Sequence, residues 1–163
     1  MSMNLSDLRE SNEFLNLLLD NINSAVLIAD ENMQIHQFNT SFLDLFDRAT
    51  DQPVDRSFGQ IAGCVYAVKE NQSCGHTSQC QFCSIRQSLL QTLLDKASVD
   101  RQRLERRFYI DGQSVNKHLE ISARPIRFQG RRMILVIIYD ITDIEMQKKA
   151  LEAKQAQIDR DLE

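Results

Sequence analysis

The sequence lacks any apolar run long enough to cross a membrane as a helix. Its longest apolar run covers residues 133–139 and has only the length of a strand. The N-terminus has neither the basic segment nor the apolar segment of a secretory signal peptide. With a net charge of −4, the chain also lacks the positive excess typical of bulk nucleic-acid binding. These absences predict a cytoplasmic chain with no membrane partner and no nucleic-acid partner.

The sequence also lacks the motifs that would indicate an enzyme. It contains no glycine-rich phosphate loop, no paired-carboxylate motif and no phosphate-accepting histidine motif of a histidine kinase. Hydrophobic residues make up 42% of the chain and charged residues 26%, which is an ordinary balance for a globular protein. We therefore expect one folded domain with some additional helix and no catalytic activity.

Cysteine is scarce, and all four cysteines lie in one segment of 20 residues. They are Cys64, Cys74, Cys80 and Cys83. Four thiolates close in sequence can converge on one metal in a closed tetrahedral site, and the C-x-x-C pair is a frequent part of such sites. The spacing fits structural zinc or an iron–sulfur cluster and does not decide between them. His76 is a possible substitute for one of the thiolates.

Two other interpretations of the cysteines stay open. Cys80 could form a reversible disulfide with Cys83, or a pair farther apart in sequence could do so. Alternatively, all four could be buried and unreactive. Disulfides are rare in cytoplasmic proteins, and unreactive cysteines usually scatter through a core instead of clustering. Both considerations favour the metal site.

The spacing of apolar residues predicts an alternation of helices and strands. The expected helices cover residues 5–22, 40–46, 82–97 and 143–163. The expected strands cover residues 24–30, 33–38, 103–110, 115–128 and 133–139. Asn39 is the expected N-cap of the second helix. In the last helix, Ile144, Leu151 and Ile158 are seven residues apart, with Leu162 beyond them, a weak heptad pattern that predicts a parallel coiled coil.

These patterns also predict which side chains are buried. One face of the helix at 82–97 is expected to bury Ile85, Leu89, Leu93 and Leu94. The expected aromatic core consists of Phe42, Phe46, Phe82 and Phe108. Residues 133–139 are expected to be covered on both faces. The side chains expected to face solvent are His36, His118, Arg101, Arg103, Arg106 and Arg107.

Three segments of the sequence resemble the PAS sensor domain. They are residues 25–30 (AVLIAD), 35–42 (IHQFNTSF) and 139–142 (YDIT). The resemblance covers roughly residues 12–145 and implies an α+β fold, with helices on one face of a five-stranded antiparallel sheet. The implied parts are a cap or dimer helix at 1–22, a sensor domain at 23–142 with its cysteine-rich segment at 64–83, and a signalling helix or coiled-coil linker at 143–163.

The resemblance also implies a function. In PAS domains a closing Asp-Ile-Thr commonly joins the last strand to a signalling helix, so Asp140 and Thr142 are the expected relay residues. The chain looks like a subset of bacterial PAS sensors that carries a Cys, a Cys-Gly and a C-x-x-C before the long helix. This implies sensing of redox state, oxygen or a small ligand through a four-cysteine metal site. No flavin or haem motif is recognised.

The implied partners are a second copy of the chain, bound through the terminal helices, and a downstream output domain. A histidine kinase, a diguanylate cyclase or a serine phosphatase is compatible with the resemblance. Two other functions fit the same residues. One is a zinc-stapled PAS domain for interaction or dimerisation without a sensing role. The other is a PAS receptor for a small molecule, in which the cysteines are incidental.

Overall fold

The computed structural model describes residues 12–46, 57–72, 74–128 and 130–163, and these residues form a sheet with helices around it. The strands are β1 (Ala25–Ala29), β2 (Ile35–Phe38), β3 (Val99–Ile110), β4 (Gln113–Phe128) and β5 (Arg131–Asp140). They form one antiparallel sheet in the order β2-β1-β5-β4-β3. The predicted α+β fold with a five-stranded antiparallel sheet is confirmed.

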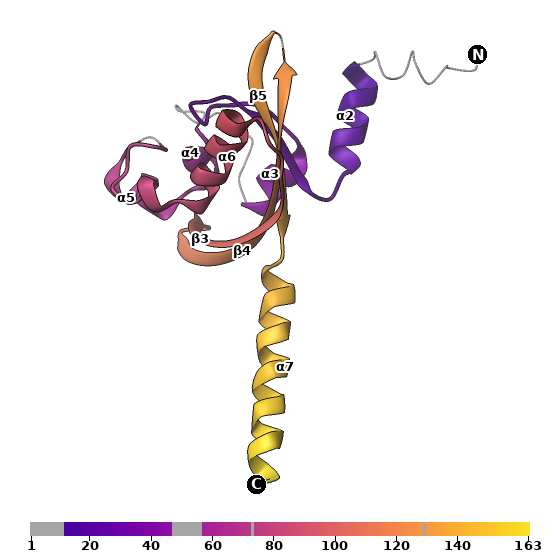
Figure 1. Ribbon diagram of the computed structural model, residues 1–163, viewed down its shortest axis with the longest axis vertical. Helices are drawn as coiled ribbons and strands as arrows, with labels where there is room; N and C mark the ends of the chain where they lie inside the picture. The colour runs from indigo at the N-terminus through magenta and orange to yellow at the C-terminus, as the bar shows by residue number, and fades with distance from the viewer. Residues whose placement is uncertain (1–11, 47–56, 73, 129) are drawn as a thin grey trace, which may run out of the picture.

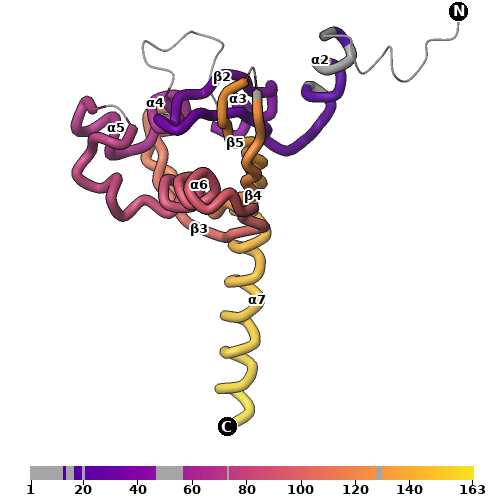
Figure 2. Tube along the Cα trace, turned by 45° about the horizontal axis from the view of Figure 1, so that its top comes forward, coloured from indigo at the N-terminus to yellow at the C-terminus, as the bar shows by residue number. Residues whose placement is uncertain are grey.

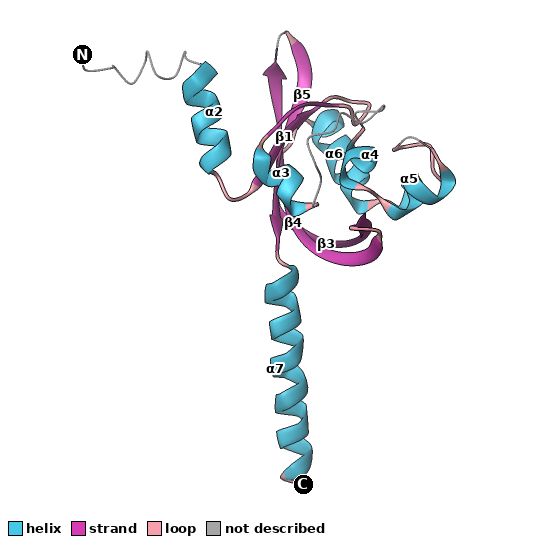
Figure 3. Ribbon diagram, turned by 180° about the vertical axis from the view of Figure 1, so that it is seen from behind, coloured by secondary structure: helices cyan, strands magenta, loops and turns pink. Residues whose placement is uncertain are grey.

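The helices lie on both sides of this sheet and beyond its end. They are α2 (Asn12–Asn21), α3 (Thr40–Leu45), α4 (Phe58–Ala62), α5 (Val65–Glu70), the 3-10 helix η1 (Cys80–Phe82), α6 (Ser84–Asp95) and α7 (Thr142–Asp161). Figure 1 shows α4, α5 and α6 on one side of the sheet and α2 on the other, and Figure 3 shows the same layers from behind. The part of the predicted N-terminal helix before residue 12 lies outside the described residues.

The core lies between the sheet and the helices α4 to α6. Side chains alternate along a strand, so every second residue of β4 and β5 faces these helices. Leu119, Ile121 and Ala123 of β4 are fully buried in this way, and so are Ile134 and Ile138 of β5. The other face of β5 is more open, because Leu135 and Ile137 are only partly buried and Tyr139 is exposed. The expectation that residues 133–139 are covered on both faces is therefore wrong.

Helix α6 covers the sheet with Ile85, Leu89 and Leu93, which are buried as predicted. Leu94 is 79% exposed, so its expected burial is wrong. Consecutive residues of a helix point about 100° apart. The buried face of α6 extends from Leu93 toward Thr92 and Ser88, so Leu94 lies outside it.

An aromatic cluster joins α3, α4 and β3. Phe46 is fully buried, and its ring centroid lies 5.3 Å from that of Phe42, 6.0 Å from that of Phe58 and 4.7 Å from that of Phe108. Phe82 does not belong to this cluster. It ends η1 and is 67% exposed, which corrects its predicted place in the core.

Asn39 holds α3 to the sheet and to the chain before β1. Its side-chain oxygen accepts hydrogen bonds from the amides of Phe42 (3.2 Å) and Val26 (2.9 Å). Its side-chain amide donates to the carbonyl oxygens of Ser24 (2.9 Å) and Leu19 (3.1 Å). The predicted N-cap is confirmed, and the four bonds explain how this amide can be buried.

Helix α7 extends away from the sheet after β5 (Figure 2). None of its residues is buried. Within the described part of the chain, no helix is long and apolar enough to cross a membrane.

Candidate functional site

The four cysteines lie in and beside the helical segment between α4 and α6. Cys64 is the N-cap residue of α5, Cys80 opens η1, and Cys83 is the N-cap residue of α6. These three are buried, and Cys74, in the loop after α5, is partly buried. Neither cysteine at an N-cap uses its side chain to cap the helix. We call these four residues the cysteine cluster.

Gly59 of α4 allows two of the cysteines to approach the same point. A Cβ atom on residue 59 would lie 3.1 Å from Cβ and 3.3 Å from Sγ of Cys74, and 3.4 Å from Cβ of Cys64. Any side chain at this position would press on both cysteines. The close packing of Cys64 and Cys74 therefore depends on the glycine.

Cys80 lies in a turn that stabilises a thiolate. The amide of Gly75 donates to its Sγ at 3.1 Å, and the hydroxyl oxygen of Thr77 lies 2.9 Å from the same atom. Burial raises the pKa of Cys80, but the hydrogen bonds from Thr77 and Gly75 and the nearby charge of Arg86 outweigh it and lower the pKa. Cys80 is thus ionised more easily than an ordinary cysteine.

Cys74 has the opposite environment. Burial is the largest cause that raises the pKa of its thiol, and the neighbouring thiols of Cys80, Cys83 and Cys64 act in the same direction, because a second negative charge beside them is unfavourable. The amide of Gly59 opposes the shift, and the net result is a pKa of about 11. Each of the other cysteines therefore lies close enough to Cys74 to affect its charge.

Arg106 supplies positive charge to the cluster from β3. Its Nη2 atom lies 3.5 Å from Sγ of Cys64, and its guanidinium lies 4.8 Å from the ring centroid of Tyr66. Burial lowers the pKa of Arg106, but the thiols of Cys83 and Cys64 outweigh this and raise it. The expectation that Arg106 is a solvent-facing member of a basic cluster is wrong.

The alternation of side chains along β3 could have shown that Arg106 lies on the core side. Phe108 faces the core and is fully buried, and residues two apart on a strand share a face. Leu104 and Arg106 therefore lie on the core side, whereas Arg103 and Arg107 are exposed as predicted. Gly59 and Arg86 had no such signal, because their contacts with the cluster depend on how α4 and α6 pack.

The donor set suits a soft metal, but the side chains are not arranged around one. Four thiols lie together, three of them buried, and thiolates are the ligands that zinc and iron–sulfur clusters use. Among the described residues, however, no three Cys, His, Asp or Glu side chains are placed so that they could hold a metal ion. His76, the predicted substitute ligand, is exposed. The metal site stays a prediction.

The predicted relay residues meet at the junction of β5 and α7. Asp140 Oδ2 lies 2.6 Å from Nζ of Lys117 on β4, and Asp140 Oδ1 accepts a hydrogen bond from the amide of Thr142 at 3.0 Å. The hydroxyl oxygen of Thr142 accepts a hydrogen bond from the amide of His118 at 3.0 Å. Burial raises the pKa of Asp140, but the hydrogen bonds from Lys117 and Thr142 outweigh it and lower the pKa. These contacts hold the first residue of α7 against β4.

Comparison with known proteins agrees with this arrangement. The family described as PAS domain matches residues 13–76. The PAS domain of nitrogen regulation protein NR(II) from Vibrio parahaemolyticus is 23% identical, with a TM-score of 0.52 over 78% of this chain and 97% of that chain. The chain has a PAS fold. A PAS domain from Colwellia psychrerythraea is 15% identical, with a TM-score of 0.53 over 80% of this chain and 97% of that one.

The PAS fold also occurs in a larger protein that resembles the chain over almost its full length. This is an RNA-binding Light-Oxygen-Voltage receptor, 14% identical, with a TM-score of 0.60 over 98% of this chain and 40% of that one. No curated protein matches the chain in sequence. Membership of the cysteine-bearing PAS subset stays a prediction.

The two strand histidines are not simply solvent-facing. His36 Nε2 lies 2.9 Å from Oδ2 of the buried Asp30. The side chain of His118 is 8% exposed, and its Nδ1 lies 3.5 Å from Oε1 of Glu105. The predicted exposure of His118 is wrong, because the chain enters α7 beside it and the amide of Ile141 donates to its carbonyl oxygen.

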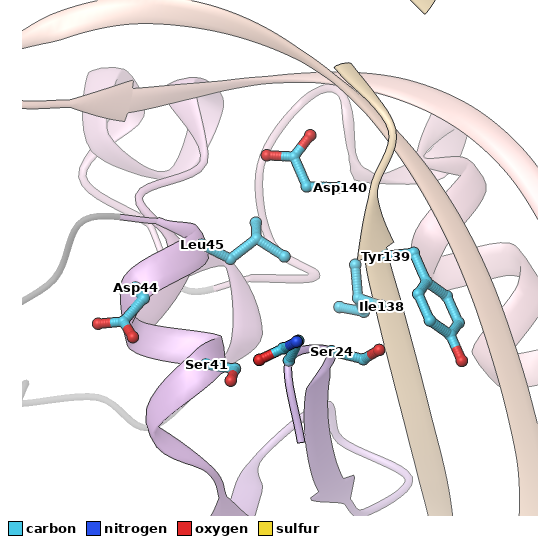
Figure 4. Close-up of a pocket in the computed structure, with 8 residues that line it drawn as sticks. Ser24, Ser41, Asp44, Leu45, Ile138, Tyr139 and Asp140 are labelled. Atoms are coloured by element: carbon cyan, nitrogen blue, oxygen red, sulfur yellow. The ribbon is translucent and has the colours of Figure 1, made fainter. Parts of the chain in front are cut away.

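A pocket of about 600 Å³ lies beside the junction of β5 and α7, between α3 and the end of β5 (Figure 4). Its polar lining includes Ser24, Ser41, Asp44, Tyr139 and Asp140. The pocket therefore shares Asp140 with the contacts that hold α7.

Proposed function

We propose that the chain is the PAS sensory module of a signalling protein, with the cysteine cluster as its input and α7 as its output. A continuous path of contacts between the two carries the proposal. Cys64 forms an antiparallel bridge with Phe108 of β3, and β3 pairs with β4. His118 of β4 then donates to Thr142 at the start of α7. A change in packing at the cluster would therefore reach α7 through two paired strands.

In this proposal the cysteine cluster binds zinc or an iron–sulfur cluster. The proximity of all four thiols and the lowered pKa of Cys80 support metal binding, because a metal ligand must be deprotonated. The thiol side chains would have to turn toward one another, as no three are placed to hold a metal now. Zinc would fix the segment in one shape, and an iron–sulfur cluster would add redox or oxygen sensitivity. The open alternative is a reversible disulfide within the cluster.

Metal analysis of protein purified without oxygen tests this input. We expect either colourless protein with one zinc per chain, or coloured protein with iron and sulfide. Cys80→Ser is expected to remove most of the metal, because the variant lacks the thiol that Gly75 and Thr77 stabilise in its ionised form. Ser84→Ala, beside the cluster on an exposed position, is the control and should retain it. Metal-free wild-type protein, or full metal content in Cys80→Ser, would refute the metal site.

The output in this proposal is a parallel dimer of α7. Ile144, Leu151 and Ile158 are 64%, 67% and 52% exposed, and their spacing of seven places them on one helix face. An exposed apolar stripe of this kind is typical of a helix that pairs with a second copy. The paired helices would lead to an output domain, for which a histidine kinase, a diguanylate cyclase and a serine phosphatase are the candidates. The module itself would act in the cytoplasm without catalysis.

Light scattering on Leu151→Glu tests the dimer. We expect at least a tenfold weaker dimer, because a carboxylate would be buried at the centre of the stripe without a partner. Ala153→Glu introduces the same charge on an exposed position outside the stripe and should leave the dimer intact. An unchanged mass for Leu151→Glu would contradict pairing through α7.

A receptor for a small molecule is the second candidate, and the pocket of about 600 Å³ beside Asp140 supports it. Its volume is in the range of small-molecule sites. A ligand that co-purifies with the protein, together with intact folding after metal removal, would favour this candidate. Unfolding of Cys80→Ser would favour a zinc-stapled interaction domain instead.

A further inference from the structure

The hairpin of β4 and β5 reaches beyond the strands on either side of it (Figure 1). β3 pairs with β4 only as far as Ala123, and β1 pairs with β5 only as far as Ile134. Pro125 lies in the part of β4 that has no β3 partner, as expected for a residue without an amide hydrogen. We call residues 124–133 the hairpin tip. It is rich in positive charge, with Arg124, Arg127, Arg131 and Arg132.

Two of these arginines have a carboxylate nearby. Arg124 Nη2 lies 3.9 Å from Oδ1 of Asp100, and Arg131 Nη2 lies 4.0 Å from Oδ2 of Asp30. Their charges are thus partly balanced within the domain.

The other two arginines face each other. Arg127 and Arg132 are directly opposite in the pairing of β4 with β5. By strand alternation they continue the core-facing rows that contain Ala123 and Ile134. Side chains at opposite positions are close, and like charges there destabilise a sheet. In the described part of the chain, neither guanidinium has an ion-pair or hydrogen-bond partner.

A cavity of about 360 Å³ lies at this pair. Arg127 and Arg132 line it together with Lys96, the C-cap residue of α6. Its apolar lining includes Leu93 and Pro125, and none of the described residues that line it carries a carboxylate. Three cations thus surround a cavity whose remaining walls are largely apolar.

We propose that this cavity binds a small organic anion with an apolar body. The anionic head would lie between Arg127, Arg132 and Lys96, and the body would contact Leu93 and Pro125. Guanidinium groups form strong paired hydrogen bonds with carboxylates and phosphates, and an anion would relieve the repulsion between the two arginines. The cavity volume is at the lower end of the range for small-molecule sites. The site is separate from the cysteine cluster, and β5 runs directly from Arg132 to Asp140 at the start of the output helix.

Titration with octanoate, followed by NMR of backbone amides, tests the site. Octylammonium serves as a probe with the same tail and the opposite charge. We expect octanoate to bind, with the largest shifts in residues 93–96 and 125–133, and octylammonium not to bind there. Arg127→Gln or Arg132→Gln should weaken octanoate binding at least about tenfold, since each removes a charged hydrogen bond. Arg124→Gln is the matched control, because Arg124 does not line the cavity.

A second measurement needs no ligand. Arg132→Gln should raise the melting temperature of the free protein by about 1–3 °C, because it removes the repulsion across the strands. Equal affinity for octanoate and octylammonium, no shifts at the tip, or unchanged binding by both arginine variants would overturn the proposal. A lower melting temperature for Arg132→Gln would also contradict it.

Discussion

Replacing Phe46 with alanine is expected to destabilise the domain by about 3–5 kcal/mol. The Phe46 side chain is fully buried and contacts three other phenylalanine rings, with the closest centroid, that of Phe108, at 4.7 Å. Its removal leaves a cavity between α3, α4 and β3 that the surrounding helices and strand cannot fill. Because Phe108 also opposes Cys64 in the backbone bridge, the same variant should loosen the connection between the cysteine cluster and the sheet.

Phe82→Ala is the matched control, because it makes the same chemical change at a side chain that is 67% exposed. Phe82→Ala is expected to change the free energy of unfolding by no more than about 0.5 kcal/mol. Urea denaturation followed by far-UV circular dichroism measures both variants, since the chain has no tryptophan to report unfolding by fluorescence. Equal losses of stability in the two variants would show that the buried Phe46 contributes no more to stability than the exposed Phe82.

Asp140→Asn is expected to lower the free energy of unfolding by about 1–2 kcal/mol and to release the start of α7 from β4. The carboxylate holds Lys117 at 2.6 Å and the amide of Thr142 at 3.0 Å, and its side chain is 29% exposed, so solvent screens part of the interaction. Hydrogen exchange of the first turn of α7 should become faster. Asp143→Asn, on an exposed position in the same turn, is the control.

The effect of Asp140 should depend on pH. Its pKa is lowered in the folded protein, so the carboxylate stabilises the fold wherever it is ionised in both states, above its unfolded pKa of about 3.9. This stability is lost as the pH falls through the lower folded pKa. The difference between the wild type and Asp140→Asn should therefore be constant near neutral pH and shrink below about pH 4. A difference that persists at lower pH would show that the carboxylate charge is not its cause.

Local patterns predicted the elements well where one face of an element is buried. The spacing of Ile85, Leu89 and Leu93 identified the buried face of α6, because burial on one side produces a period that is visible in sequence. The prediction for Leu94 failed because the spacing of apolar residues does not show on which side of Leu93 the buried face ends, and the prediction for Phe82 failed because hydrophobicity does not show where a side chain points. Both are apolar and exposed, which is common on protein surfaces.

The surroundings of the cysteine cluster were not predictable in the same way. Arg106 is 42 residues from Cys64 in the chain, and only the packing of α5 against β3 brings the two together. The contact of Gly59 with Cys74 likewise depends on the path of the loop between α5 and η1. Sequence spacing gave the donor types, but the positions of the sulfur atoms follow from tertiary contacts.

The spacing of apolar residues predicted the helices and strands, and the resemblance to PAS domains implied the α+β fold, the antiparallel sheet and the junction at Asp140 and Thr142. These features are encoded locally, in the spacing of apolar residues and in short motifs. Tertiary structure alone decided that Arg106 lies beside Cys64, that Cys80 and Cys74 have opposite pKa shifts, and that Arg127 faces Arg132 at a cavity. Such properties depend on groups distant in sequence, because burial and charge act through space.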